Sequence, residues 1–246
     1  MPQIDQRQRA EKIRKGVFRF FSLKLLVTGS LFLASLYSFA IIAHEVVYEN
    51  EQAFDNRAFA FFAAYSSPGL ISAMQFFTFF GSSGFLLPAY TILVAYFVAK
   101  KKFRYGLHIT IVALSSTAVM FALKNLTHRH RPELPIIKGI TNYSFPSGHA
   151  LSAFIFCGIF IYIVLHAAIS QLSKWIFASL LVCFAITVGI SRIVLRVHYP
   201  TDVVASFCLG IIWAITSLWI LKKISRKNEM KDAPVPDRPI AKMDNQ

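Results

Sequence analysis

Apolar residues in this chain fall into long runs rather than at the periods of amphipathic helices or strands. A helix needs about 20 predominantly apolar residues to cross the hydrocarbon core of a membrane. Runs near that length predict spans at residues 25–44, 84–99, 107–124, 150–169, 175–193 and 203–221. The chain is therefore expected to be an all-α, polytopic membrane protein with six transmembrane helices.

The segments around these runs divide the chain into three predicted regions. Residues 1–24 form a basic N-terminal segment, and residues 25–221 form the six-span membrane domain. Residues 222–246 contain three prolines and alternating charges, which predicts a disordered tail. In the long loop after the first span, residues 69–80 are too few to cross the membrane, so they are expected to form a short interfacial helix.

Composition supports a membrane protein and narrows its class. The 246 residues are 55% hydrophobic with a mean hydropathy of +0.53, and 15% are charged, against about 25% in soluble domains. The net charge of +14 does not call for a nucleic-acid partner, because basic residues gather in the cytoplasmic loops of membrane proteins. The three cysteines all lie inside apolar runs and predict neither a disulfide framework nor a metal site.

Lysine and arginine are distributed unevenly between the two sides of the predicted membrane domain. Nineteen of the 26 lie in residues 1–24, 100–104, 169–174 and 222–246, and seven lie in the segments between these. The protein is expected in the inner (plasma) membrane of the cell. The positive-inside rule then predicts that both termini lie in the cytoplasm. The loops after the first, third and fifth spans face the periplasm or the outside.

Three short polar blocks stand at the ends of spans on that predicted outer side. They are Lys124 with Arg131-Pro132, then Pro146-Ser147-Gly148-His149, then Ser191-Arg192 with His198 and Asp202. Cations and histidines are costly beside lipid, so their presence at span ends indicates a functional site. A phosphate-binding site with a histidine nucleophile needs side chains of these kinds.

The second block is typical of an anion site at the start of a helix. Ser147 is a favoured N-cap residue, and Gly148 lets an anion approach the backbone closely. The unpaired N–H groups of the first turn and the helix dipole attract negative charge. The alternative interpretation is a capped helix start at which His149 has no chemical role.

The third block supplies a candidate nucleophile. His198 and Asp202 are four residues apart and share one face if the segment is helical. A carboxylate at one imidazole nitrogen fixes the tautomer and leaves the other nitrogen free to attack. Arg192 alone would fit a snorkelling side chain, but its position near both residues favours a site.

The first block adds two cations, Lys124 and Arg131. Either one alone also fits a helix end anchored at lipid headgroups, but with Arg192 they would stabilise the charge of a phosphoryl-transfer transition state. His128 and His130 lack a third ligand close in the sequence, so no metal site is expected.

In this order and at this spacing, the blocks resemble the signature Lys-x6-Arg-Pro, Pro-Ser-Gly-His and Ser-Arg-x5-His-x3-Asp of the type 2 phosphatidic acid phosphatase superfamily. The resemblance covers about residues 84–221 and implies six spans and catalysis without a metal or other cofactor. It implies that His198 is a nucleophile that forms a phosphohistidine, that Asp202 orients it and that His149 protonates the leaving oxygen. The phosphate-binding residues that it implies are Lys124, Arg131, Ser147, Gly148 and Arg192.

Three positions depart from the family pattern. His130 stands where many members have proline, whereas Arg196 and Ser206 stand where glycine is common. None of the three is a predicted catalytic residue, and we expect them to affect headgroup choice or helix packing.

The predicted function is that of a lipid phosphatase acting on a phosphate monoester or pyrophosphate at the outer face. Candidate substrates are undecaprenyl pyrophosphate, phosphatidylglycerophosphate, phosphatidic acid and phosphorylated lipid A. The alternatives are a lipid phosphotransferase with the same site and a non-catalytic lipid transporter or scaffold; the oligomeric state stays open. Aromatic rings favour the interface, so a phenylalanine group is expected to border the lipid's entry path, or alternatively to pack against the other spans: Phe76, Phe77, Phe79 and Phe80.

Overall fold

The computed structural model describes the backbone of residues 2–49 and 52–232 and the side chains of residues 23–48 and 52–224. All regular elements in these ranges are helical. In chain order they are α1 (Pro2–His44), the π-helix η1 (Glu45–Glu49), α2 (Ala53–Ala64), α3 (Pro68–Phe79), α4 (Ser83–Ala99), α5 (Phe103–Thr127), α6 (Gly148–Leu165), α7 (Gln171–Val194) and α8 (Pro200–Asp232). Six segments of the described chain are long and apolar enough to cross a membrane, so the predicted class is confirmed.

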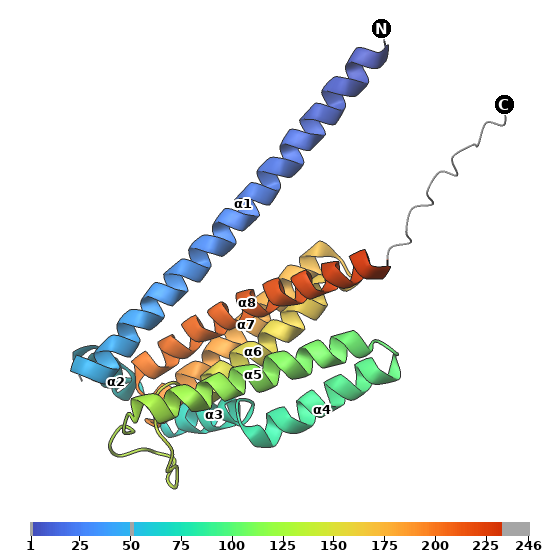
Figure 1. Cartoon of the computed structure of the whole chain (residues 1–246). Helices are drawn as coiled ribbons and strands as arrows, with labels where there is room; N and C mark the ends of the chain where they lie inside the picture. The colour runs from blue at the N-terminus through green and yellow to red at the C-terminus, as the bar shows by residue number, and fades with distance from the viewer. Residues whose placement is uncertain (1, 50–51, 233–246) are drawn as a thin grey trace, which may run out of the picture.

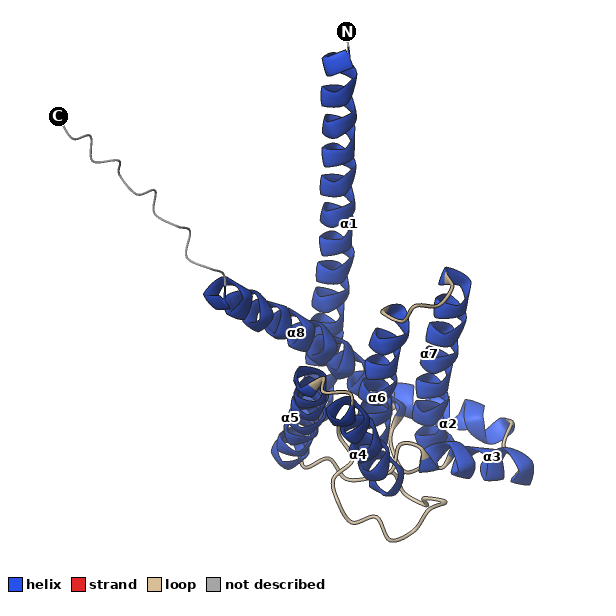
Figure 2. Ribbon diagram, turned by 90° about the vertical axis from the view of Figure 1, so that its right-hand side faces the viewer, coloured by secondary structure: helices blue, strands red, loops and turns tan. Residues whose placement is uncertain are grey.

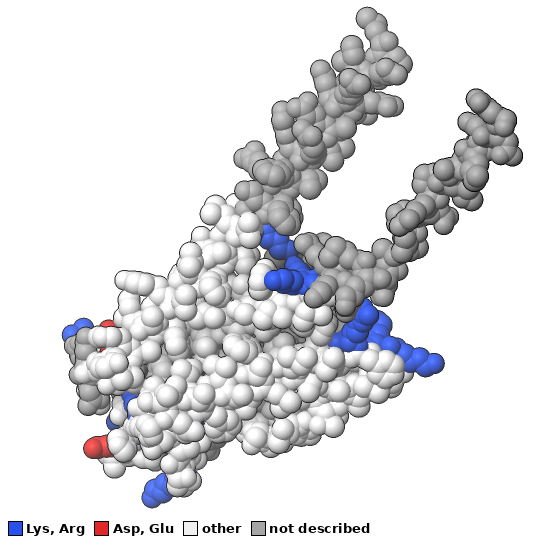
Figure 3. Space-filling view, viewed as in Figure 1, with Lys and Arg blue, Asp and Glu red and all other residues white. Residues whose placement is uncertain are grey.

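The long helices form a bundle, and the segments that connect them lie at its two ends (Figure 1). The N-terminal end of α1, the C-terminal end of α8 and the α4–α5 turn lie toward one end, and the loop between α5 and α6 lies at the other (Figure 1). On the face shown in Figure 3, lysine and arginine gather at these two ends and leave a broad uncharged band between them. A band of this kind is what the hydrocarbon core of a membrane requires.

The loop between the first two predicted spans differs from the prediction because it contains two helices rather than one. The unpredicted helix is α2, which packs on α7 and α8. The expected helix, α3, begins with Pro68 after the N-cap Ser67, whose hydroxyl accepts a hydrogen bond from the Leu70 N–H at 3.2 Å. In Figure 2, α3 lies across the direction of α7. Its position at the membrane interface stays a prediction.

The predicted boundary of the C-terminal tail also differs from the structure. Helix α8 continues beyond residue 221 to Asp232, so the first part of the predicted disordered tail is helical. Residues 233–246 of that tail lie outside the described residues. The predicted division into N-terminal segment, membrane domain and tail otherwise stays a prediction.

Among the described residues, many of the buried side chains lie at the predicted outer end of α6, α7 and α8. Most long apolar side chains elsewhere face outward, as lipid contact requires, but this region contains apolar residues that are at most 1% exposed: Ala150, Leu151, Val188, Leu195, Val197 and Ala205. Glycine permits the close approach of α7 and α8, because a Cβ at Gly189 would lie 2.5 Å from the Phe207 ring. The site described below is built on this rigid end.

Candidate active site

The three polar blocks, which are far apart in the sequence, meet at one cavity. Lys124 comes from the last turn of α5, Arg131 from the following loop, Gly148 and His149 from the first turn of α6, and Arg192 from the last turn of α7. These five residues and His198, in the α7–α8 connection, line a cavity of about 790 Å³. The structure thus brings six of the eight predicted site residues to one surface.

The other two predicted residues lie behind the cavity wall. Ser147 is the N-cap of α6, as predicted, and its hydroxyl accepts from the Ala150 N–H at 3.5 Å. It is fully buried, so its side chain supports the start of α6 and does not line the cavity. Asp202 is also fully buried and lies behind His198.

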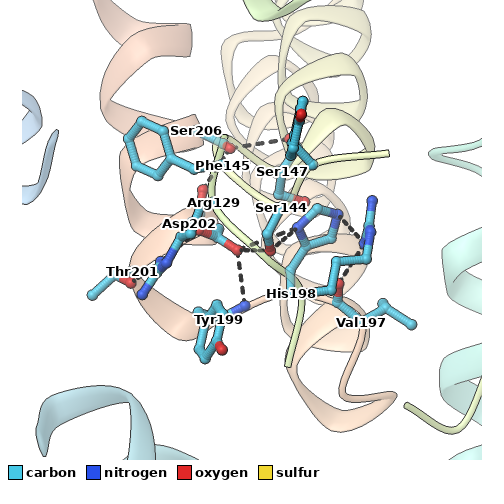
Figure 4. Close-up of polar contacts among 12 residues, drawn as sticks. Arg129, Ser144, Phe145, Ser147, Val197, His198, Tyr199, Thr201, Asp202 and Ser206 are labelled. Carbon is cyan, nitrogen blue, oxygen red and sulfur yellow. Dashed lines mark hydrogen bonds and ion pairs between the residues drawn. The ribbon is translucent and has the colours of Figure 1, made fainter. Parts of the chain in front are cut away.

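His198 is held between an acid on one side and a cation on the other (Figure 4). Its Nδ1 lies 3.4 Å from Asp202 Oδ2 and 3.3 Å from the Ser144 hydroxyl. Its Nε2 lies 3.3 Å from an Arg131 guanidinium nitrogen, and a guanidinium is only a donor. Nε2 must therefore be the acceptor, and the proton is on Nδ1, facing Asp202. In this tautomer Nε2 has no proton, and its lone pair, which accepts from Arg131, lies on the side of the cavity.

The pKa of His198 keeps Nε2 unprotonated. The pKa is lowered to about 3, mainly by burial; Asp202 raises it, whereas Arg131 and Arg192 lower it. The imidazole is consequently neutral through the physiological pH range, as a nucleophile must be.

The short sequence from Tyr199 to Asp202 explains why the carboxylate has this orientation. Pro200 is the first residue of α8, a position at which proline is favoured because its missing N–H has no helical partner. Asp202, two residues further on, reaches back and accepts the Tyr199 N–H at 2.9 Å through Oδ2. The same oxygen accepts a short hydrogen bond from the Ser144 hydroxyl. The start of the helix thus aligns the oxygen that faces His198.

Arg192 and Lys124 bring positive charge to the cavity and retain capacity for a ligand. Arg192 is 3% exposed and donates to the Thr78 hydroxyl of α3 at 2.5 Å, whereas its Nε is buried and has no partner among the described residues. Lys124 donates to the backbone oxygens of Tyr143 and Ser144, which leaves one of its three ammonium protons. Buried donors without partners are costly, so an anion in the cavity would stabilise this arrangement.

Sequence reasoning missed three residues at the centre of this site. Ser144 and Asp55 carry no local signal, because a serine in a loop and an aspartate in an acidic stretch are ordinary surface residues. Arg129 could be taken for one more cation beside the first block, yet it forms ion pairs with both Asp202 and Asp55. The α5–α6 loop brings Ser144 and Arg129 to Asp202, and the packing of α2 against α8 adds Asp55.

Arg196, one of the departures from the family pattern, adopts a left-handed backbone conformation with a φ of 52°. Glycine adopts this conformation without strain, which explains why glycine is common there. The Arg196 guanidinium lies 5.2 Å from the centre of the Phe59 ring of α2, outside the cavity. Ser206, the second departure, donates to the Asp202 and Ser147 backbone oxygens at 2.7 and 3.0 Å, so it joins α8 to the start of α6.

A glycine in the α3–α4 turn allows the start of α6 to approach. A Cβ at Gly81 would lie 2.9 Å from Val188 Cγ1 and 3.0 Å from both Cβ and the backbone oxygen of His149. We expect Gly81→Ala to displace His149 and lower kcat by roughly 10- to 100-fold, since small misplacements of catalytic groups cost about this much. Phosphate release by purified enzyme in detergent would measure it.

The matched control for that variant is Gly158→Ala, in the same helix as His149 but with nothing within 4 Å of the added Cβ. It should retain wild-type kcat. Equal activity of both variants would show that Gly81 does not position His149.

A bundle of membrane-spanning helices with histidines and buried cations around one cavity defines the class as an integral membrane enzyme that acts on phosphate esters. Residues 104–226 match the PAP2 superfamily. The chain is 31% identical to phosphatidylglycerophosphatase B of Bacillus subtilis (strain 168) over 184 residues, which cover 74% of this chain and 89% of that protein.

Solved structures agree with this relationship. A crystal structure of a transmembrane PAP2 type phosphatidylglycerolphosphate phosphatase from Bacillus subtilis superimposes with a TM-score of 0.68 and 29% identity, covering 81% of this chain and 96% of that chain. LpxE of Aquifex aeolicus shares the fold, with a TM-score of 0.53 and 22% identity over 68% of this chain and 96% of its own. The chain belongs to the PAP2 superfamily. It is a multi-pass membrane protein and a metal-independent phosphoric monoester hydrolase that acts on lipid phosphates.

Proposed function

We propose that this enzyme hydrolyses the phosphate monoester of phosphatidylglycerophosphate through a phosphohistidine on His198. The relative of 31% identity is named for that substrate. The observation that carries the proposal is the shape of the cavity. One end is lined by cations beside His198, and the rest, between α4 and α5, is lined mainly by apolar side chains.

The apolar part of the cavity fits a lipid tail. Its lining includes Leu86 and Val98 of α4 and Ile109 and Met120 of α5. Ile109 and Lys124 are 15 residues apart on α5, which corresponds to roughly 22 Å along a helix. A fatty acyl chain can therefore lie along the cavity while its phosphate reaches the cations at the outer end.

The phenylalanines expected at the lipid's entry path lie outside the lining of this cavity. Phe80 instead packs against Phe85 and Phe184, with ring centroids 4.9 and 5.2 Å apart. These rings join α3, α4 and α7, because aromatic pairs between helices are stable without water. The entry path that we propose is the space between α4 and α5.

The proposed reaction has two steps. Lys124, Arg131 and Arg192 hold the phosphate, and His198 Nε2 attacks phosphorus while the bond to the lipid oxygen breaks. His149 gives its proton to that oxygen and releases the lipid alcohol. Water then gives a proton back to His149 and attacks phosphorus, which releases inorganic phosphate and restores His198.

We also propose that the site faces the periplasm or outside of an inner (plasma) membrane, with both termini in the cytoplasm. The excess of lysine and arginine at the opposite end of the bundle supports this orientation (Figure 3). A cysteine at Gly139, in the loop that contains Arg131, should then react with an impermeant maleimide in intact cells.

The test of function is a panel of pure substrates assayed with EDTA present. We expect inorganic phosphate from phosphatidylglycerophosphate, with less from phosphatidic acid and undecaprenyl pyrophosphate. Chromatography of the lipid products separates hydrolysis from transfer, because a phosphotransferase would form a new phosphorylated lipid instead of free phosphate. Strict dependence on an added metal, or preference for another lipid, would contradict the proposal.

A further inference from the structure

Arg129 lies directly behind the proposed nucleophile and is buried among acids. It is 8% exposed, and its guanidinium donates to Asp202 Oδ1 at 2.6 Å and to Asp55 Oδ2 at 2.8 Å. The same guanidinium stacks on the Tyr199 ring at 4.0 Å. Arg129 therefore holds the oxygen of Asp202 that does not face His198 (Figure 4).

Asp55 reaches the same place from α2, a separate part of the chain. It is 1% exposed, and its Oδ1 accepts the Thr201 N–H at 2.9 Å while its Oδ2 accepts the Thr201 hydroxyl at 2.8 Å. Thr201 is the second residue of α8, so its N–H is one of the donors that a helix start leaves unpaired. Asp55 thus caps the helix that carries Asp202 and also holds Arg129.

These contacts divide the two oxygens of Asp202 between two tasks. Oδ2 serves His198, Ser144 and Tyr199, whereas Oδ1 is paired with Arg129. A carboxylate is planar and turns about its Cβ–Cγ bond as one unit, so a contact at either oxygen resists the turn. The short contact of Arg129 with Oδ1 therefore adds to the contacts of Oδ2 and holds Oδ2 more firmly at His198 Nδ1.

We propose that Asp55 and Arg129 are positioning residues that set the orientation of Asp202, and through it the Nδ1–H tautomer of His198. The inference rests on the proposed function of His198 as nucleophile. It gives the first outer loop a role in the reaction, because α2 delivers Asp55. Neither residue lines the cavity, so neither contacts the lipid phosphate.

The test compares Asp55→Asn, Arg129→Lys and Arg129→Met with the wild type in detergent. We expect kcat for lipid phosphate to fall by roughly 10- to 100-fold in Asp55→Asn and Arg129→Met, with KM changed less than about threefold. Arg129→Lys keeps the charge and should recover part of the loss. The kcat of the double variant Asp55→Asn/Arg129→Met should lie within about threefold of the kcat of Arg129→Met, because Asp55 acts through Arg129.

Inhibition by vanadate separates positioning from a loss of folded protein. Vanadate mimics the trigonal-bipyramidal phosphoryl group, so its Ki should rise by about the factor by which kcat falls. A fraction of unfolded enzyme lowers kcat per total protein but leaves Ki unchanged. The matched controls are Arg57→Met and Glu133→Gln, which change exposed residues at the same end of the bundle as Arg129. Both should retain the wild-type kcat and the wild-type Ki for vanadate.

Each outcome is decisive. Any of three results would overturn the inference: wild-type kcat in Asp55→Asn, an unchanged vanadate Ki in the slow variants, or losses of kcat that multiply in the double variant. Hydrolysis of lipid phosphate by the wild type would still uphold the proposed function. If the wild type itself releases no phosphate from any lipid, the proposed function fails, and the inference fails with it.

Discussion

His198→Ala should abolish lipid dephosphorylation, with kcat reduced at least about 10⁴-fold, as is typical when a covalent nucleophile is removed. The imidazole is 2% exposed and fixed between Asp202 and Arg131, so its removal takes away the group that we propose attacks phosphorus. Release of inorganic phosphate from radiolabelled lipid measures the loss. His166→Ala, at the exposed end of α6, is the control histidine and should keep full activity.

The covalent intermediate provides a second measurement on the same variant. Rapid quenching of the wild type with ³²P-labelled substrate should give an acid-labile, alkali-stable label on the protein, and His198→Ala should give none. Substantial turnover in His198→Ala, or label that persists in it, would show that the nucleophile is another group.

His149→Ala should lower kcat for lipid substrates by about 10²- to 10⁴-fold, the usual contribution of a general acid. His149 lies in the first turn of α6 and lines the cavity together with His198 and Arg192. A lipid alkoxide is a poor leaving group and needs a proton as its bond to phosphorus breaks. When 4-nitrophenyl phosphate is the substrate, 4-nitrophenolate leaves as a stable anion and needs no proton.

The comparison of these two substrates isolates proton donation. The variant should lose far less activity toward the aryl phosphate than toward the lipid, whereas His198→Ala should be inactive toward both. An equal loss on the two substrates in His149→Ala would mean that His149 binds the phosphate or supports α6 and does not act as the acid.

Much of the fold could be predicted because membrane helices follow a local rule. Every backbone polar group in lipid must be paired within its own segment, so a long apolar run becomes a helix whatever surrounds it. The predicted start of the second span at residue 84 lies within one residue of the start of α4 at Ser83 for this reason. Helix α2 was missed because its twelve residues carry no such run, and its packing on α7 and α8 stabilises it.

The sequence by itself determined the membrane class, the six apolar segments and the types of residue available for phosphate chemistry. Hydropathy and motif spacing depend only on residues that are close in the sequence. Only the tertiary structure decided that Ser147 supports the cavity wall, that the apolar cavity runs between α4 and α5, and that Arg129 joins Asp55 to Asp202. Asp55 and Arg129 are 74 residues apart, so no local sequence pattern could indicate that they form an ion pair. Buried ion pairs are stable only with a matched partner, and the partner is supplied by the fold.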